Sequence, residues 1–409
     1  MNGTYLLGVV IFVVALLVSV TLHEAGHFVM ARRFGMKATQ FFVGFGPTIF
    51  SRTRGETEYG IKAIPLGGFC KIVGMTPLEE VPPEDAPRAF YVQPAGRRAI
   101  VLVAGSVMHF IIAIVLTFVT LATLGGPDLH RVGVAAVESC VPLAETATSC
   151  APGDPAGPAQ AAGLRPGDRI ARVNGVATPD PAALVTQLRA HPGQDLVLDV
   201  RRGTRDVTLH LTPVPVQRHQ IVNGTQTGPL VTVGQIGVQP AQTGQFLYRQ
   251  SPLQAIAGTG DLLRFQLEGV WTAVTHKLGS VTQLFSKHRD PAGFVGIVGA
   301  TRVSGDVLAA TSVPLSSRIF SILSIIIGLN LFVGLFNLLP LLPLDGGHIA
   351  VVAYQKVRDT IRRRRGAAPM GPVDYARLMP ITYAVAGLFL VFSVALAGAD
   401  ILNPIRIVQ

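Results

Sequence analysis

The stretch "SVTLHEAGHF" (Ser19–Phe28) places two histidines and a glutamate, His23, Glu24 and His27, at the end of an apolar segment. The preceding residues, "YLLGVVIFVVALLVSV" (Tyr5–Val20), carry no charge and are typical of a membrane span. On a helix, residues four positions apart project from one face, so the two imidazoles can share one metal ion. Ionisable side chains in a membrane helix are costly and usually serve a function inside a bundle. The stretch therefore predicts a metal site near the end of a membrane helix.

The glutamate beside the first histidine completes the pattern His-Glu-x-x-His, which typically binds Zn²⁺. Glu24 would lie next to the metal and could take a proton from water bound there. The alternative is that the motif falls at the cytoplasmic end of the helix, where its polar side chains are simply hydrated.

The composition is too apolar for an ordinary soluble protein, because 49% of the 409 residues are hydrophobic and 14% are charged. Four segments have the roughly 20 apolar residues that a helix needs to cross a bilayer. They lie near Gly3–Ala31, Ala99–Leu124, Ile319–Leu339 and Ile381–Leu402. The first lacks the basic start and the cleavage site of a secretory signal, so we expect it to remain in the mature protein. The composition predicts a polytopic α-helical membrane protein with four transmembrane helices.

The net charge of +10 does not indicate nucleic-acid binding, because the basic residues cluster beside the spans. Arg32, Arg33, Lys37, Arg52, Arg54, Lys62, Lys71, Arg88, Arg97 and Arg98 lie between the first two spans, and Lys356, Arg358, Arg362 to Arg365 and Arg377 lie between the last two. The positive-inside rule makes both loops cytoplasmic. We therefore expect both termini and the long middle segment outside the cytoplasm.

The segments between the spans differ in character. After the first helix, short aromatic and β-branched runs separated by glycine turns predict a membrane-associated β-hairpin region. The middle segment alternates short strands with turns and predicts a compact domain. The expected organisation is residues 1–33, transmembrane helix 1; 34–98, cytoplasmic or re-entrant β-hairpin region and loop; 99–124, helix 2; 125–240, extracytoplasmic domain; 241–316, amphipathic linker on the outer membrane surface; 317–355, helix 3; 356–378, basic cytoplasmic loop; and 379–409, helix 4.

The three cysteines fit this topology. Cys140 and Cys150 are close together in the outside segment, where a disulfide can persist, whereas Cys70 is alone in a cytoplasmic loop. The sequence predicts a Cys140–Cys150 disulfide, with two free thiols in an Ala/Pro-rich loop as the alternative.

A catalytic zinc site needs a third protein ligand and an open position for water. Asp345 is the best candidate, because it is an acid within the apolar run "GLNLFVGLFNLLPLLPLDGGHIAVV" (Gly328–Val352), close to the cytoplasmic face. Helix-breaking residues around it would let the carboxylate turn inward: Pro340, Pro343, Gly346 and Gly347.

Other polar residues lie at membrane depth. Asn337 could orient or polarise a substrate carbonyl, or could form a hydrogen bond between helices. His348 is expected beside the ligands or at the interface, and His109 is expected to be a satisfied interior residue.

Two motifs together carry a resemblance to a known family. "HEAGH" (His23–His27) and "NLLPLLPLDGG" (Asn337–Gly347) resemble the signatures of the site-2 proteases, which are intramembrane zinc metalloproteases. The actinobacterial, mycobacterial-type members with one PDZ domain look most similar. The resemblance implies that His23, His27 and Asp345 bind zinc, that Glu24 is the general base and that Asn337 contacts the substrate.

Two further stretches extend the resemblance. "VGFGP" (Val43–Pro47) looks like the family's re-entrant hairpin, whose edge strand would pair with unwound substrate through the region of Gly44 and Gly46. Glycines needed only for a turn are the alternative. "GPAQAAGLRPGDRIARVNGV" (Gly157–Val176) resembles a circularly permuted PDZ domain, and the insertion between Cys140 and Cys150 departs from that pattern near the expected ligand-binding loop.

The expected function is hydrolysis of peptide bonds within the transmembrane helices of single-span proteins. The resemblance implies anti-sigma factors as substrates, after a first extracytoplasmic cut, and a bacterial plasma membrane as the location, with the active site near the cytoplasmic side. The lipid bilayer is a further expected partner, nucleic acid is not, and the oligomeric state is not predicted.

Two alternatives belong to other classes. A PDZ-bearing scaffold or chaperone would hold a structural metal, which needs a fourth protein ligand, and the sequence offers no cysteine placed to supply it. A metal transporter would require more intramembrane acids or histidines along a path.

Overall fold

The computed structural model describes residues 3–75, 79–127, 132–144, 150–178, 181–203, 205–222, 225–240, 247–276, 281, 284–285, 294–311 and 313–404. The chain forms two compact units. One joins Met1–Val119 to Leu262–Gln409, and the other is Thr120–Asp261.

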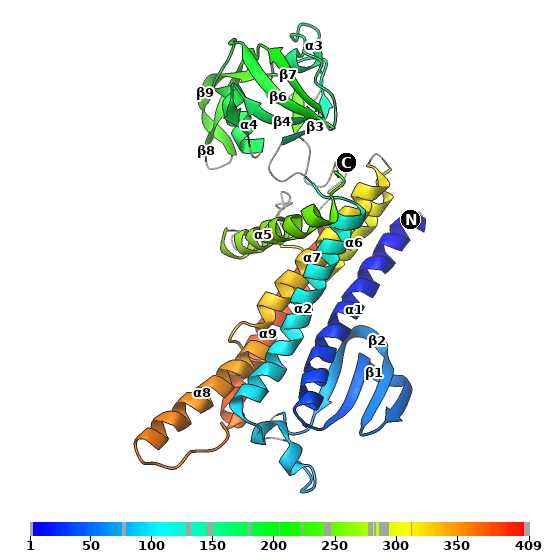
Figure 1. Cartoon of the computed structure of the whole chain (residues 1–409), viewed down its shortest axis with the longest axis vertical. Coiled ribbons are helices and arrows are strands. Elements are labelled where there is room, and N and C mark those ends of the chain that lie inside the picture. The colour runs from blue at the N-terminus through cyan, green and yellow to red at the C-terminus, as the bar shows by residue number, and fades with distance from the viewer. Residues whose placement is uncertain are drawn as a thin grey trace. The chain divides into compact units, whose positions relative to one another are not determined.

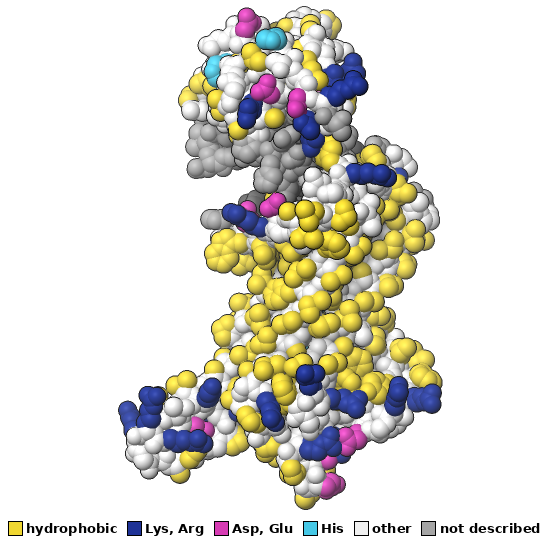
Figure 2. All heavy atoms as spheres, in the orientation of Figure 1, with side chains coloured by type: hydrophobic (Ala, Val, Ile, Leu, Met, Phe, Trp, Pro, Cys, Tyr) yellow, Lys and Arg dark blue, Asp and Glu magenta, His cyan; other side chains and the backbone are white. Residues whose placement is uncertain are grey.

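The first unit is a helical bundle built on long apolar helices (Figure 1). Within the described part of the chain, four stretches are long and apolar enough to cross a membrane: α1 (Gly3–Arg33), α2 (Ala95–Thr123), α7 (Leu315–Asn337) and Tyr375–Leu402, which comprises a 3₁₀ turn (Tyr375–Leu378) and α9 (Met379–Leu402). They match the four predicted spans. Figure 2 shows a broad hydrophobic surface over this bundle, with Lys and Arg gathered at the end that carries the hairpin and the basic loop. A lipid-facing exterior explains the exposed apolar side chains.

The predicted third span, residues 317–355, is interrupted in the structure. Helix α7 ends at Asn337, and α8 (Asp345–Arg364) begins after a turn. Pro340 and Pro343 explain the break, because proline lacks the N–H that an α-helix needs. A Cβ on Gly347 would lie 2.6 Å from the carbonyl carbon of Leu341, so only glycine lets α8 start against this turn. Asp345 is thereby the first residue of a new helix.

The segment predicted as a surface linker, residues 241–316, contains two helices, α5 (Pro252–His276) and α6 (Ile297–Ala309). Helix α6 contacts α1, α7 and α9, so it belongs to the bundle. A Cβ on Gly8 of α1 would lie 3.0 Å from Cα of Gly305 of α6, so small residues permit this contact. The carboxylate of Asp400 in α9 also accepts hydrogen bonds from the N–H groups of Gly296 and Gly299, each at 2.9 Å. The linker prediction is therefore corrected for α6.

The predicted hairpin region forms one long antiparallel ribbon, β1 (Ala38–Arg54) and β2 (Thr57–Ile72), followed by 3₁₀ turns at Ala86–Arg88 and Phe90–Val92. The first half of β1 pairs on both sides: Phe42, for example, has both Gly60 and Phe69 of β2 as partners. The second half of β1 pairs only with the first half of β2. The ribbon therefore folds into a four-segment sheet in which residues 40–43 are central and residues 68–72 form an outer edge.

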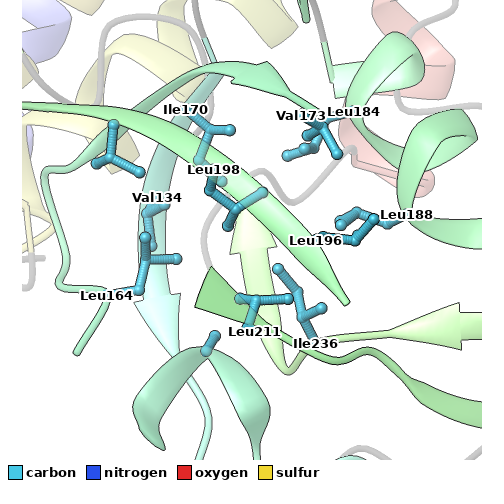
Figure 3. Close-up of a cluster of buried hydrophobic side chains, with 12 residues drawn as sticks. Val134, Leu164, Ile170, Val173, Leu184, Leu188, Leu196, Leu198, Leu211 and Ile236 are labelled. Atoms are coloured by element: carbon cyan, nitrogen blue, oxygen red, sulfur yellow. The ribbon is translucent and has the colours of Figure 1, made fainter. Parts of the chain in front are cut away.

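The second unit is mainly β. Its elements are β3 (Val132–Val137), α3 (Pro158–Ala161), β4 (Arg169–Val173), β5 (Val176–Ala177), α4 (Pro181–Arg189), β6 (Leu196–Arg202), β7 (Arg205–Leu211), β8 (Val214–Val222), β9 (Thr225–Gln235) and β10 (Val238–Pro240). The main sheet has the order β10-β3-β4-β6-β7, with β5 beside β4, while β8 and β9 form a separate hairpin. Alternate residues of β6 are buried in one core, Leu196, Leu198 and Val200. Figure 3 shows Leu196 and Leu198 in this core, together with Leu184 and Leu188 of α4.

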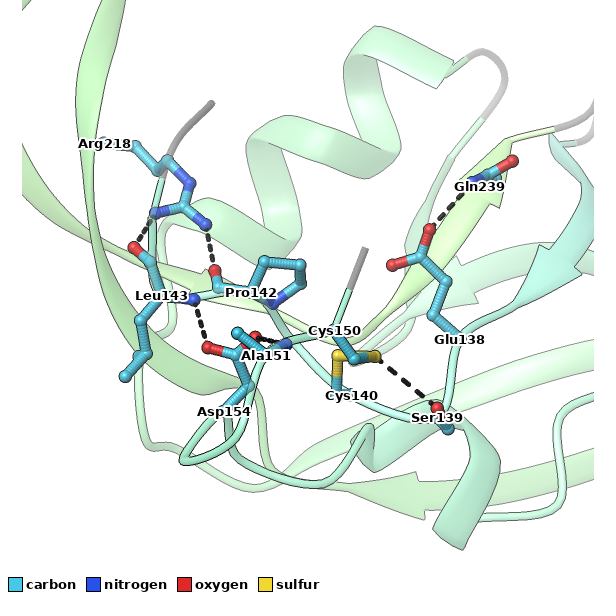
Figure 4. The surroundings of a disulfide bond; sticks show 10 residues. All are labelled: Glu138, Ser139, Cys140, Pro142, Leu143, Cys150, Ala151, Asp154, Arg218 and Gln239. Atoms are coloured by element: carbon cyan, nitrogen blue, oxygen red, sulfur yellow. Dashed lines mark hydrogen bonds between the residues drawn. A yellow bond between two sulfur atoms is a disulfide. The ribbon is translucent and has the colours of Figure 1, made fainter. Parts of the chain in front are cut away.

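The predicted disulfide is present between Cys140 and Cys150, whose Cα atoms are 5.9 Å apart (Figure 4). Asp154 organises the same loop, because its carboxylate accepts N–H bonds from Ala151 at 2.8 Å and from Leu143 at 3.0 Å. These two bonds hold the pKa of Asp154 below its usual range. Arg218 of β8 donates to the carbonyls of Pro142 and Leu143, which ties the loop to the β8–β9 hairpin.

The core of the second unit makes a testable prediction about Leu198, which is fully buried. Leu198→Ala should lower the free energy of unfolding of this unit by about 2–5 kcal/mol, because it leaves a cavity. Val197→Ala is the matched control, since Val197 is the neighbouring residue on the exposed face, and it should cost about 0.5 kcal/mol. Pulse proteolysis of the full chain in urea measures both. Equal losses for the two variants would contradict the assigned core.

Candidate metal centre

Helix α1 carries His23 and His27 on its buried face. The residues are 8% and 5% exposed, and they continue a buried stripe that includes Phe12 and Ser19. This spacing follows from the helical repeat, which brings residues three, four and seven positions apart to one side. The four-residue spacing therefore places both imidazoles on the face of α1 that packs into the bundle.

Asp345 meets the two histidines from the start of α8. Its Oδ2 atom lies 3.4 Å from Nε2 of His23 and 3.4 Å from Nε2 of His27, and the two Nε2 atoms are 3.1 Å apart. Among the described residues, these three form the one group of His, Cys, Asp and Glu side chains with donor atoms close enough to hold a metal ion, all within 4.8 Å of one another. The break between α7 and α8 makes this possible, because it puts Asp345 at a helix start.

Two glycines let α2 approach the histidines closely. A Cβ on Gly26 of α1 would lie 2.8 Å from the carbonyl carbon of Ala104, and a Cβ on Gly105 of α2 would lie 2.6 Å from Cε1 of His23. Both distances are shorter than real Cβ contacts. Glycine is therefore required on both helices for the imidazoles to keep their positions.

The hydrogen bonds around the group fit a cation between the three donors. Nδ1 of His27 donates to the carbonyl oxygen of Val101 at 2.8 Å, because a carbonyl oxygen can only accept. In the neutral ring, Nε2 of His27 then presents a lone pair toward Asp345. Oδ2 of Asp345 is buried and has no hydrogen-bond partner in the described structure. A lone pair facing a carboxylate oxygen is unfavourable without a positive charge, so the donor set fits a divalent metal.

Glu24 lies on α1 next to His23 and contacts the β-ribbon. Its Oε2 atom accepts the backbone N–H of Cys70 at 3.0 Å. The sequence does not predict that Cys70 lies beside Glu24, because Glu24 is on helix α1 and Cys70 is on strand β2, far apart in the chain. Burial, with a smaller contribution from Glu24, raises the pKa of the Cys70 thiol to about 12, so the sulfur stays a neutral thiol at pH 7. The sulfur also lies outside the group of three donors.

The other predicted site residues, Asn337, Gly44 and Gly46, do not belong to the group of three donors. Asn337 is the half-buried last residue of α7, and its side chain forms no hydrogen bond with the described residues. Gly44 and Gly46 have positive φ angles of 88° and 82°, so the bend in β1 by itself explains why they are glycines.

The register of the ribbon limits where a free strand edge can lie near "VGFGP" (Val43–Pro47). Residues 40–43, the last of which begins the motif, have partners on both sides, whereas Phe45 pairs with Ile64 alone and the register gives no strand partner for Gly44 or Gly46. Pairing of the motif with a substrate therefore stays a prediction. The edge segment that lies beside the site is residues 68–72 of β2, which contacts Glu24 through Cys70. Sequence alone does not reveal this, because the register of a bent ribbon depends on its bulges.

A buried asparagine that the sequence does not single out, Asn330, lies near the histidines. Asn330 of α7 is 1% exposed, and its Oδ1 atom is 2.8 Å from Nδ1 of His109. This bond agrees with the expectation that His109 is a satisfied interior residue. Asn330 could have been identified by the same signal as Asn337, since each is a polar residue within an apolar span. The Nδ1 atom of His348 lies 3.3 Å from the hydroxyl oxygen of Tyr375.

Apolar helices long enough to cross a membrane, enclosing two histidines and an aspartate that could hold a metal ion, are what an intramembrane metalloenzyme requires. The model of peptidase family M50 matches residues 11–380, and the chain belongs to this family. The predicted relationship to the site-2 proteases is thus confirmed, and the chain is an intramembrane protease.

Curated relatives include zinc metalloprotease Rip1 of Mycobacterium tuberculosis, which is 38% identical over 99% of this chain and 100% of its own length. The protein of the same name from Mycolicibacterium smegmatis is 38% identical over 98% of this chain and 99% of its own length. Metalloprotease MmpA of Caulobacter vibrioides is 29% identical over 86% of this chain and 88% of its own length.

The fit of α2 against the histidines makes a prediction about Gly105. Gly105→Ala should abolish stoichiometric metal binding, because the added methyl group would displace both imidazoles. Gly96→Ala on the same helix is the control, since a Cβ there has no atom within 4 Å. Mass spectrometry of the metal content per purified chain checks this. Full metal content in the Gly105 variant would show that the histidines do not depend on the close approach of α2.

Proposed function

We propose that this zinc metalloprotease holds its metal between His23, His27 and Asp345 and cleaves peptide bonds within the transmembrane helices of single-span proteins. The observation that carries the proposal is the convergence of Oδ2 of Asp345 on both Nε2 atoms, at 3.4 Å each. Three protein donors are the number found in catalytic zinc sites, whereas a structural site uses four. Zinc bound there supplies Lewis-acid activation of water and of the scissile carbonyl.

Glu24 is the proposed general base. It is half-buried, and its Oε2 atom is held by the N–H of Cys70, which fixes the plane of the carboxylate. Oε1 accepts no hydrogen bond from the described residues and is available to take a proton from the attacking water. The same carboxyl group can then deliver the proton to the leaving amine.

Substrate binding requires the target helix to unwind, because a helical amide is inaccessible to the base. The edge at residues 68–72 supports strand addition, since it lies beside Glu24 and can replace the backbone hydrogen bonds that the helix loses. In this proposal, Asn337 donates an amide N–H to a substrate carbonyl. Gly44 and Gly46 contact the substrate at the bend of the ribbon.

The proposed location is a bacterial plasma membrane, with both termini and residues 125–240 extracytoplasmic and the site near the cytoplasmic side. The distribution of Lys and Arg supports this orientation. The Cys140–Cys150 disulfide also supports it, because disulfides persist outside the cytoplasm.

We assign the second unit as a PDZ domain that selects substrates. It contains a cavity of about 470 Å³ lined by α4, by the disulfide loop and by the residues that lead into β10, with apolar side chains from Val141, Leu188 and Ile236. Such a cavity can receive an apolar chain end or exclude a bulky domain. The proposed substrates are anti-sigma factors already shortened by a first extracytoplasmic cut.

Glu24→Gln should abolish cleavage while leaving the bound zinc at the wild-type level, because glutamine keeps the bond from Cys70 but cannot accept the proton. Glu268→Gln is the control, since Glu268 is an exposed residue of α5 paired with Arg264. Membrane proteomics of cells that produce each variant checks the prediction: truncated single-span proteins should accumulate only with Glu24→Gln. Retained proteolysis by the purified Glu24 variant would refute the assignment of the base.

A further inference from the structure

The two histidines of the centre differ in how their second nitrogen is satisfied. His27 donates its Nδ1 proton to Val101. Nδ1 of His23 is buried and has no hydrogen-bond partner in the described structure. Histidines that bind metals usually donate this second N–H to an acceptor, which fixes the ring and its tautomer. The orphaned nitrogen of His23 therefore calls for an acceptor close by.

His109 of α2 lies next to the imidazole ring of His23. The centroids of the two rings are 5.0 Å apart, with their planes inclined by 41°. His109 follows Gly105 by one helical turn, so both residues are on the face of α2 that packs against His23. It is 2% exposed. Centroids 5.0 Å apart leave room for a hydrogen bond between a nitrogen of one ring and a nitrogen of the other when the two nitrogens face each other.

The neighbours of His109 determine which of its nitrogens can accept. Nδ2 of Asn330 donates to the carbonyl of Ile326 at 2.9 Å and to Oγ of Ser19 at 3.1 Å. Because a carbonyl only accepts, these contacts fix the orientation of the Asn330 amide and leave Oδ1 facing Nδ1 of His109. Nδ1 of His109 therefore carries the proton. In the neutral ring, Nε2 of His109 is an acceptor.

We propose that His109 is a positioning residue that accepts the Nδ1 proton of His23 and thereby aims Nε2 of His23 at Asp345 and the metal. This inference rests on the proposed zinc site. The resulting chain of contacts leaves α1 at Ser19, passes through Asn330 of α7 and His109 of α2, and returns to α1 at His23. Since Ser19 and His23 are one helical turn apart, the loop fixes the metal-binding face of α1 relative to two other helices.

A purely structural role for His109 would make its size and shape important, whereas the proposed role depends on its lone pair. His109→Phe keeps a planar ring but removes the acceptor. His109→Gln removes the ring but supplies an amide oxygen that can accept a hydrogen bond from His23. Comparing the two variants separates packing from hydrogen bonding. Should His109→Phe not fold in detergent, His109→Leu removes the acceptor with a smaller side chain.

The test is a titration of the purified full-length chain with zinc in competition with a chromophoric chelator. His109→Phe should bind zinc about 10–100-fold more weakly than the wild type, as is typical when such a partner is lost. His109→Gln should recover most of that loss. The visible spectrum of the Co²⁺-substituted chain should change with His109→Phe and return toward that of the wild type with His109→Gln. Equal zinc affinities for wild type and His109→Phe would overturn the proposal, as would equal losses for the Phe and Gln variants.

Asp345→Asn in the same titration separates this inference from the proposed function. If this variant binds zinc as tightly as the wild type, the metal lies elsewhere and the proposed site fails. If it loses zinc while His109→Phe does not, the site stands and only the role of His109 is overturned.

Discussion

The rest of the first unit depends on one contact. Inside the apolar bundle, the carboxylate of Asp345 faces two imidazole nitrogens. Its Oδ2 atom is buried and 3.4 Å from each Nε2. Burying a charge without a partner costs several kcal/mol. A divalent metal held by the three side chains, as proposed, would offset that cost. In the proposed function, the same contact would then serve both the fold and the chemistry.

The backbone around the cluster is arranged to permit this meeting. Prolines end α7, so that α8 can begin at Asp345. Gly26 and Gly105 let α1 and α2 close on the imidazoles. Each of these devices weakens a helix locally, because proline breaks the hydrogen-bond ladder and glycine has low helix propensity. Their cost is acceptable in a membrane, where tightly packed small residues drive helix association.

Much of this arrangement can be predicted from the sequence. The four spans follow from long apolar runs, and His23, His27 and Asp345 follow from two motifs at matching membrane depth. The disulfide follows from two cysteines that lie close together in one segment between the spans. Each prediction depends on local composition or spacing, which a single sequence displays directly.

What the sequence does not reveal depends on contacts between distant elements. Helix α6 is short and has mixed polarity, and only its packing against α1, α7 and α9 identifies it as part of the bundle. The double pairing of residues 40–43 depends on bulges whose positions are not local signals. Asn330 and Asn337 are two turns apart in one span, and the sequence alone did not indicate that Asn330 is the one in contact with His109.

The central claim is that two imidazoles and one carboxylate of this chain hold the metal. X-ray absorption spectroscopy at the zinc edge of the purified protein tests it directly, because the technique reports the ligand atoms themselves. The account predicts a shell of nitrogen and oxygen at about 2.0–2.2 Å, with the outer-shell scattering of two imidazoles. A sulfur shell at about 2.3 Å would contradict it, since it would require a cysteine ligand.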